Sequence, residues 1–318
     1  MTNASAFHFE SLVWDWPIAI YLFLIGISAG LVTLSILLRR YHPEAGGADS
    51  TLLRTTLVVG PGAIILGLLI LIFHLTRPWT FWKLMFHYSF TSVMSMGVLL
   101  FQLYMVVLIL WLAIIFQKEV MALQQRWFPR LGLVQKVLTL LTPFNRGLET
   151  LMLVLAVLLG AYTGFLLSVL KSYPFLNNPI LPVLFLFSGI SSGAAVALIA
   201  MALRQRGNPH STEAHFIHRV ETPVVWLEIF LLAAFFVGLA LGDDGKMRAL
   251  SAALGGGFWT WWFWIGVAGL GLIVPMLLKP WASRGSTFHG VLAVCGASLT
   301  GVLLLRFFIL YAGQLTVA

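Results

Sequence analysis

Polar and titratable side chains recur near one end of each of the first four long apolar segments of the sequence. Asp15 and Tyr21 open the first segment, and His74 closes the second. Polar residues at the edge of a bilayer core cost free energy unless they pair with one another or line a cavity. The sequence therefore predicts a pocket for an amphipathic ligand, with seven candidate binding residues: Asp15, Tyr21, His74, Arg77, Ser92, Ser95 and Tyr162.

His74 is the candidate proton acceptor of this group. An imidazole near the end of an apolar run can take up a proton close to neutral pH. A quinol releases two protons with its two electrons, so its oxidation needs a base at one hydroxyl and a donor such as tyrosine or serine at the other. The residues alone leave two interpretations open: a proton acceptor for a quinol, or a boundary histidine hydrogen-bonded to backbone or lipid.

Metal and haem sites are not expected. A membrane cytochrome b needs paired axial histidines facing across the bundle, but only His74 lies within an apolar segment and only His289 starts one. The lone Cys295 can form no internal disulfide and cannot by itself hold an iron–sulfur cluster, so its expected role is packing. One loop group matches no strong zinc spacing and is expected to be solvated: His210, Glu213, His215, His218 and Glu221.

Composition places most of the chain in lipid. Hydrophobic residues make up 60% of the 318 positions and charged residues 9%, a balance that a water-soluble domain cannot present without aggregating. A bilayer core of roughly 30 Å needs about 20 apolar residues per helix, and the short alternating segments of a membrane barrel are absent from the sequence. We predict an all-α integral membrane fold with eight spans, at 17–38, 56–74, 90–116, 148–170, 181–203, 223–242, 257–278 and 289–313.

Lysines and arginines determine the expected orientation. They are concentrated in the first, third, fifth and seventh connections between spans, and both termini lack them. The positive-inside rule then places these connections in the cytoplasm and both termini on the outer side of the membrane. The same rule explains the net charge of +8, so nucleic-acid binding is not expected. The acidic flank before the first span, without a cleavage site, argues against a removable signal peptide.

A short repeat divides the chain into two halves. Residues 26–30 read Gly-Ile-Ser-Ala-Gly, and residues 189–193 read Gly-Ile-Ser-Ser-Gly. Aligning them places the first four spans over the last four, as a parallel repeat. We expect two four-helix bundles, residues 1–175 with the ligand site and residues 176–318. Small residues at this spacing also serve simple close packing of helices.

Two connecting segments have their own patterns. Residues 117–130 mix apolar and charged residues at helical spacing, which predicts a helix on the cytoplasmic membrane surface. Residues 255–264 are rich in glycine and tryptophan and resemble an interfacial aromatic belt, with quinone stacking as the alternative.

Charged residues within the spans are few. Arg306 lies toward the predicted outer side, and its expected partner is Asp243 or Asp244 rather than Glu228. The glutamates either begin a proton path or are buried and protonated, and the sequence leaves both open. Three of them lie toward the predicted cytoplasmic side: Glu149, Glu221 and Glu228.

Four stretches resemble one known family of membrane subunits. They are residues 14–24 (Trp-Asp-Trp-Pro-Ile-Ala-Ile-Tyr-Leu-Phe-Leu) followed by Gly26 and Gly30, residues 74–82 (His-Leu-Thr-Arg-Pro-Trp-Thr-Phe-Trp), residues 92–97 and residues 160–164. These stretches resemble the NrfD family, which includes the membrane subunits of polysulphide reductase and of alternative complex III. The resemblance covers essentially the whole chain.

The resemblance implies an eight-helix, haem-free subunit that takes electrons from menaquinol near the periplasmic face. It implies that electrons pass to a periplasmic ferredoxin-like subunit with 4Fe–4S clusters, then to multihaem cytochromes and to nitrite, which anaerobic respiration reduces to ammonia. No haem and no iron–sulfur cluster is implied in this chain. Two alternatives remain open: an ion or solute transporter built on the parallel repeat, and a passive membrane anchor for an iron–sulfur protein.

Some candidate residues depart from the family pattern. Tyr21 stands where the polysulphide reductase subunit has a quinone-contacting histidine, and Ile18 replaces an asparagine there. His74 stands where the relatives usually carry Asp or Glu, so the resemblance implies a proton acceptor of another chemical type. Tyr162 matches a tyrosine that the resemblance implies to touch the quinone, and residues 92–95 form the Ser-x-x-Ser turn that opens the third span.

Overall fold

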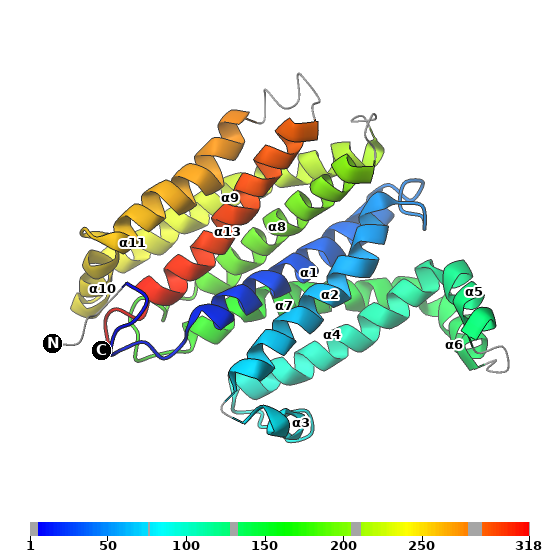
Figure 1. Ribbon diagram of the computed structural model, residues 1–318, viewed down its shortest axis with the longest axis horizontal. Helices are drawn as coiled ribbons and strands as arrows, with labels where there is room; N and C mark the ends of the chain where they lie inside the picture. The colour runs from blue at the N-terminus through cyan, green and yellow to red at the C-terminus, as the bar shows by residue number, and fades with distance from the viewer. Residues whose placement is uncertain (1–5, 76, 128–132, 205–210, 279–287, 318) are drawn as a thin grey trace.

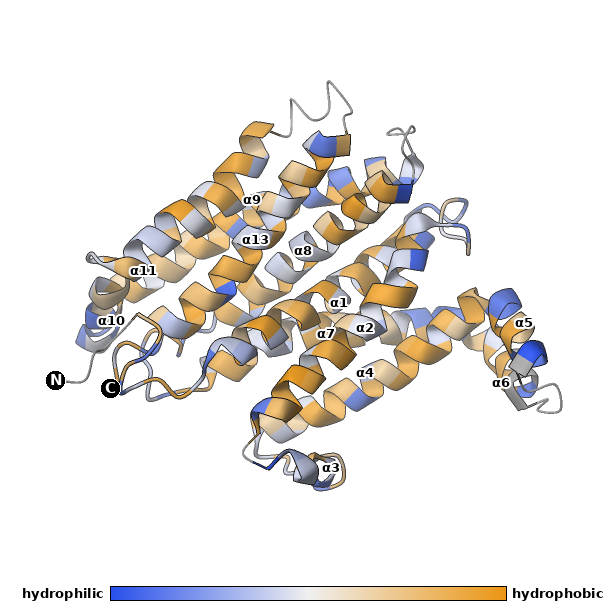
Figure 2. Cartoon of the chain, in the orientation of Figure 1, coloured by the Kyte–Doolittle hydropathy of each residue, from blue (hydrophilic) through white to orange (hydrophobic). Residues whose placement is uncertain are grey.

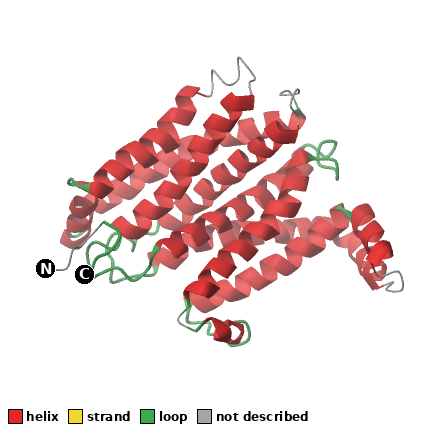
Figure 3. Cartoon of the chain, viewed as in Figure 1, coloured by secondary structure: helices red, strands yellow, loops and turns green. Residues whose placement is uncertain are grey.

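Long helices make up the fold (Figures 1 and 3). The computed structural model describes residues 6–75, 77–127, 133–204, 211–278 and 288–317. Within these ranges, eight helices are long and apolar enough to cross a membrane, which confirms the predicted number (Figure 2). The helices of these spans are α1 (Trp16–Tyr41), α2 (Thr51–His74), α4 (Val93–Ile115), α7 (Asn145–Ser168), α8 (Leu181–Arg204), α9 (Thr212–Ala240), α11 (Phe258–Trp261) continued by the π-helix η3 (Trp262–Ile273), and α13 (Phe288–Ala312).

Shorter helices connect the spans. In Figure 1, α5 and α6 project from one end of the molecule, and α5 confirms the predicted connecting helix for residues 117–127. The rest of that prediction, residues 128–130, lies outside the described residues. The short helices are η1 (Pro78–Thr80), α3 (Phe81–Leu84), α5 (Gln117–Trp127), α6 (Leu133–Leu141), η2 (Thr142–Phe144) and α10 (Asp244–Leu254).

Local signals explain where the spans begin. Pro17 lies in the first turn of α1, where its missing N–H is not needed. Ser50 and Ser92 cap α2 and α4, because each hydroxyl accepts a hydrogen bond from the N–H three residues later, at 3.2 and 3.4 Å. Ser211 caps α9 in the same way, so this helix begins well before residue 223.

α1 is the central helix of the fold. It packs against α2, α7, α8 and α13. It crosses α8 at the repeated small-residue segments: a Cβ added at Gly193 would lie 2.6 Å from the carbonyl carbon of Gly30, and one added at Gly30 would lie 2.8 Å from that of Gly189. The backbones therefore touch, as small residues permit. This supports the packing interpretation of the repeat, while the division into two bundles stays a prediction.

Two glutamates tie spans together at the end of the molecule that holds the α1–α2 connection. Glu149 of α7 accepts a hydrogen bond from Nε of Arg39 at 2.6 Å. Glu213 of α9 accepts one from the N–H of Thr51 at 3.1 Å, at the first turn of α2, where backbone donors lack helical partners. These carboxylates therefore link α1 to α7 and α9 to α2.

The predicted pairing of Arg306 with Asp243 or Asp244 is wrong. Asp243 instead caps α10, where its carboxylate accepts a backbone N–H at 2.9 Å. Arg306 instead hydrogen-bonds to α8, where its Nη2 donates to the Ser188 hydroxyl at 2.6 Å and to the Phe185 carbonyl at 3.1 Å. Glu228 follows the start of α9 by 16 residues and Arg306 follows that of α13 by 18, and both helices begin at the same end of the molecule (Figure 1). The prediction failed because it started α9 at residue 223 and so placed Glu228 too near the membrane surface.

The tryptophan-rich segment forms an aromatic cluster as well as an outward-facing surface. Trp259 stacks on Tyr311 of α13, with ring centroids 5.3 Å apart, and Phe7 packs edge-on against Trp259. Trp261 and Trp264 are exposed. The segment thus packs against residues near both ends of the chain, while its exposed tryptophans are typical of a membrane interface.

Candidate functional site

Asp15 and His74 form the centre of the candidate site. Asp15 precedes the first turn of α1, and His74 is the last residue of α2. Nε2 of His74 lies 3.7 Å from Oδ2 of Asp15, and 44% and 39% of the two side chains are exposed. Such a half-exposed pair contributes little to stability, about 0–1 kcal/mol. Its interest is chemical, because an imidazole can exchange protons near neutral pH and the nearby carboxylate offsets the charge of its protonated form.

One oxygen of this pair lacks a partner. Oδ1 of Asp15 is buried and has no hydrogen-bond partner among the described residues. Buried polar atoms in folded proteins are nearly always hydrogen-bonded, so this oxygen is suited to accept a hydrogen bond from a bound ligand. A quinol hydroxyl is a donor of the required kind.

The C-terminal end of the protein holds the segment that precedes Asp15. The amide oxygen of Gln314 accepts hydrogen bonds from the N–H groups of Val13 and Trp14, both at 2.9 Å, and its nitrogen donates to the carbonyl of Trp14 at 2.9 Å. Gln314 is 1% exposed. No sequence pattern identified this residue, since its partners lie about 300 positions away along the sequence.

Tyr21 and Tyr162 pack against the same phenylalanine. The ring centroid of each lies 5.9 Å from that of Phe101 on α4, and both tyrosines are buried. Gly97, one turn earlier on α4, lies so close to the Tyr162 hydroxyl that an added Cβ would overlap it. The structure therefore brings the two predicted tyrosines together from α1 and α7, around a residue that no motif singled out.

Ser92, Ser95 and Arg77 have local roles at the same end of the spans. The Ser92 hydroxyl accepts the N–H of Ser95 at 3.4 Å, and the Ser95 hydroxyl accepts the N–H of Ser89 at 2.8 Å. Each hydroxyl keeps its own proton for donation to another group. Arg77 lies just before η1 with an exposed side chain. A contact of these three residues with a ligand stays a prediction.

The sequence predicts no metal site, and two sets of potential ligand residues bear on this prediction: the loop group and Cys295. Among the residues that the structure describes, no three His, Cys, Asp or Glu side chains gather closely enough to hold a metal ion. In the loop group, His210 lies outside the described ranges, and the other four residues lie in α9, so the predicted solvated loop is wrong for them. Glu221 is buried, and its Oε2 lies 3.3 Å from Nδ1 of His218. Cys295 is buried and forms no disulfide, as expected of a packing residue.

Exposed apolar side chains lie near His74 along the sequence. Phe73, Trp79 and Phe90 are among the most exposed aromatic residues of the described ranges, and they lie on the last turn of α2 and in the segment leading to α4. Exposed aromatic side chains of this kind suit a lipid boundary. A ligand with an isoprenoid tail could therefore reach the polar pair from the membrane.

The sequence is similar to known proteins over its whole length. The family described as polysulphide reductase, NrfD, matches residues 4–318. The sequence is 86% identical to Protein NrfD of Escherichia coli K12 over the full length of both proteins. It is 47% identical to the Protein NrfD homolog of Haemophilus influenzae over 98% of each protein, and 38% identical to a polysulfide reductase polypeptide of Wolinella succinogenes over 96% of each.

Proposed function

This protein belongs to the NrfD family, and on that premise we propose that it is the quinol-oxidising membrane subunit of a multi-subunit respiratory oxidoreductase. Its substrate in this proposal is menaquinol. Electrons pass to a periplasmic ferredoxin-like subunit with 4Fe–4S clusters, then through multihaem cytochromes to nitrite, which is reduced to ammonia. The similarity to a polypeptide of polysulfide reductase supports a role as one part of a reductase.

The observation that carries this proposal is the contact between His74 and Asp15 beside a buried, unpaired carboxylate oxygen. A quinol hydroxyl bound here donates a hydrogen bond to Nε2 of His74 or to Oδ1 of Asp15. When the quinol loses electrons, its hydroxyl proton transfers to the imidazole, and the Asp15 carboxylate stabilises the imidazolium that forms. The partial exposure of His74 then gives the proton a way to water.

Tyr21 and Tyr162 are the proposed hydrogen-bond donors to the other oxygen of the quinol ring. The rings of Tyr21 and Tyr162 both pack on Phe101. A phenol O–H can hydrogen-bond to the quinone oxygen that forms as the second proton leaves. Tyr21, Tyr162, Arg77 and the two serines are the proposed ligand-binding residues, with His74 as the proton acceptor.

The proposed orientation puts this site at the periplasmic face. Arg39 and Arg40 occupy the last turn of α1, at the opposite end from Asp15, and basic residues favour the cytoplasmic side. Both termini are then periplasmic in a bacterial inner membrane. We keep the division into bundles of residues 1–175 and 176–318 as part of the proposal. The acceptor cluster is assigned to a partner because Cys295 alone cannot supply its thiolate ligands.

The test is His74→Gln, with His289→Gln as the matched control at the start of α13. In membranes that contain the partner subunits, quinol-dependent electron delivery should fall about 100-fold or more in His74→Gln, the range for loss of a general base, and stay unchanged in the control. If the His74→Gln protein assembles normally and delivers electrons at the wild-type rate, His74 is not the proton acceptor. That result would favour a passive membrane anchor. Solute uptake by the protein without redox partners would favour a transporter.

A further inference from the structure

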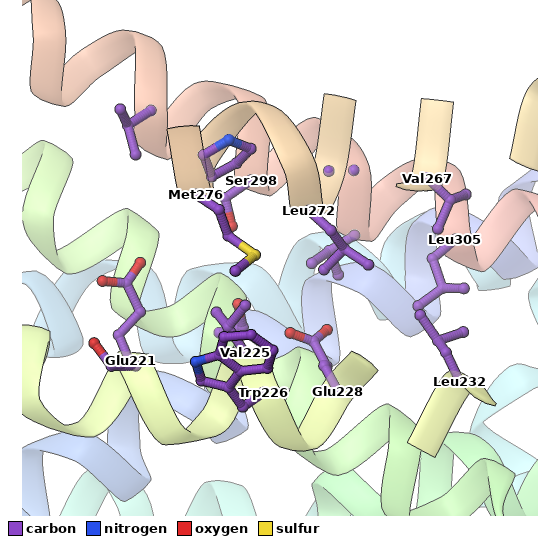
Figure 4. A pocket seen from close by; sticks show the side chains of 17 residues that line it. Glu221, Val225, Trp226, Glu228, Leu232, Val267, Leu272, Met276, Ser298 and Leu305 are labelled. Atoms are coloured by element: carbon purple, nitrogen blue, oxygen red, sulfur yellow. The ribbon is translucent and has the colours of Figure 1, made fainter. Parts of the chain in front are cut away.

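A cavity of about 150 Å³ lies among α8, α9, η3 and α13, away from the candidate quinol site (Figure 4). In Figure 4, Glu221 and Glu228 extend from α9 toward the side of the cavity formed by Leu272 and Met276. Ser191 of α8 and Ser298 of α13 add hydroxyls to an otherwise mainly apolar lining. One water molecule needs roughly 10–15 Å³ of such volume, so this cavity can hold several.

Glu228 lies at the inner end of a polar network. Glu228 is 3% exposed and lines the cavity together with Ser191. Arg306 is fully buried nearby, and its Nη2 donates to the hydroxyl of Ser188 at 2.6 Å and to the carbonyl of Phe185 at 3.1 Å. Both ionisable side chains are thus buried many residues from the starts of α9 and α13, where an uncompensated charge is very costly.

Arg306 is only half satisfied by protein groups. Its Nε and Nη1 are buried and have no hydrogen-bond partner among the described residues. The guanidinium carbon lies 3.6 Å from the ring centroid of Phe185, an attraction that holds the cation without satisfying these donors. Buried donors in folded proteins are nearly always hydrogen-bonded, which indicates ordered water as their partner.

A second carboxyl links this network to the protein surface. Glu221 lies seven positions before Glu228 on α9, which is two helical turns or about 10 Å. Nδ1 of His218 lies 3.3 Å from Oε2 of Glu221, and 47% of the His218 side chain is exposed. Three proton-exchanging groups therefore follow one another from the α8–α9 loop to the depth of Arg306.

The neighbouring helices limit which groups can interact with Glu228. α8 contributes Ser191 and α13 contributes Ser298 to the cavity lining, α9 itself contributes Glu221, and the buried Arg306 follows the lining residue Leu305 on α13. The π-helix η3 presents only apolar side chains and Gly271 to the cavity. Its wide turns are a feature often found at functional sites, and here they form the wall opposite the carboxyls.

We propose that Glu228 is a proton-exchange site in the last four spans, reached from the surface through His218, Glu221 and water in the cavity. A proton arriving on cavity water transfers to the carboxylate of Glu228 and forms its O–H bond, while Arg306 keeps its charge. Release reverses the step and returns the proton to water. This inference does not rest on quinol oxidation in the first four spans.

The experiment is infrared difference spectroscopy on the full-length protein in lipid, recorded as the pH is changed from mildly acidic to mildly alkaline. We expect a carboxyl C=O band that disappears at high pH, is absent in Glu228→Gln and shifts promptly in D₂O. Glu149→Gln is the matched control, because Glu149 is similarly buried but bonded to Arg39, and it should keep the band. In Glu221→Gln the band should remain, but its response after a pH jump should be slower.

Three results would overturn the proposal: a spectrum unchanged by Glu228→Gln, a Glu228 band that does not respond to pH, or a band that does not shift in D₂O. If Glu228→Gln does not fold, Ser191→Ala replaces it. That variant removes a hydroxyl that lines the cavity with Glu228, so the surroundings of the carboxyl become less polar and the Glu228 band should change frequency. An unchanged frequency in a folded Ser191→Ala protein would contradict the assignment.

Discussion

The side chain of Gln314 is hydrogen-bonded to both backbone groups of Trp14: its oxygen accepts the N–H at 2.9 Å, and its nitrogen donates to the carbonyl at 2.9 Å. The residue after Trp14 is Asp15, whose carboxylate meets His74. The end of the last span thus fixes the start of the first. Tyr173 adds a further restraint, because its hydroxyl donates to the carbonyl of Ser11 at 2.8 Å.

Replacing Gln314 tests whether this restraint matters for the chemistry. Gln314→Leu leaves the N–H groups of Val13 and Trp14 without their buried acceptor, which costs about 1–3 kcal/mol. Because misplacement by about 1 Å can cost up to about 100-fold in rate, quinol-dependent electron delivery should fall roughly ten- to a hundredfold. Gln314→Glu keeps an acceptor oxygen, so its rate of electron delivery should fall less. Equal, wild-type rates in both variants would show that Asp15 needs no such support.

Asp15 and His74 should depend on each other for electron delivery, whereas each should contribute little to the free energy of unfolding. Since both side chains are substantially exposed, removing either should change the free energy of unfolding by less than about 1 kcal/mol. In a double-mutant cycle of electron delivery, Asp15→Asn should slow the wild type strongly but slow His74→Gln little further. Additive losses in the cycle would indicate that Asp15 acts without His74.

The spans could be predicted because a helix that crosses lipid needs a long apolar run. The predicted bounds of the spans were least accurate where a helix begins with polar residues. α9 is the clearest case. Its first turns contain Glu213 and His218, with Pro223 following, so hydropathy alone starts the span at residue 223. The true start at Thr212 places Glu228 about as far along its helix as Arg306 is along its own, which hydropathy alone did not predict.

The candidate site was predictable only in part. The depth of a residue can be counted along a span, so the sequence placed Asp15 and His74 at one level, and the structure brings their side chains together. Gln314 and Phe101 could not be found in this way. Their roles depend on how helices distant in sequence rotate and pack against each other, and neither residue type is distinctive within an apolar span.

Gly97 should be required for the position of Tyr162. An added Cβ would overlap the Tyr162 hydroxyl, so Gly97→Ala must displace the tyrosine or separate α4 from α7, at a cost of about 1–3 kcal/mol. If Tyr162 orients the quinol, KM for the quinol should rise by roughly tenfold, equivalent to about 1.4 kcal/mol. Gly62→Ala is the control, because nothing lies within 4 Å of a Cβ there. An unchanged KM in Gly97→Ala would show that Tyr162 does not contribute to quinol binding.

The crossing of α1 and α8 should be the least tolerant place for added volume. A Cβ at Gly193 would lie 2.6 Å from the backbone of Gly30, and backbone cannot rotate aside as a side chain can. Gly193→Ala should therefore lower the thermal unfolding midpoint, with a loss of about 1–3 kcal/mol or more. Gly296→Ala in α13, where the space is open, should be neutral or stabilising by about 0.4–1 kcal/mol. Equal midpoints for the two variants, measured in the same detergent, would mean that the helices can separate at this crossing without loss of stability.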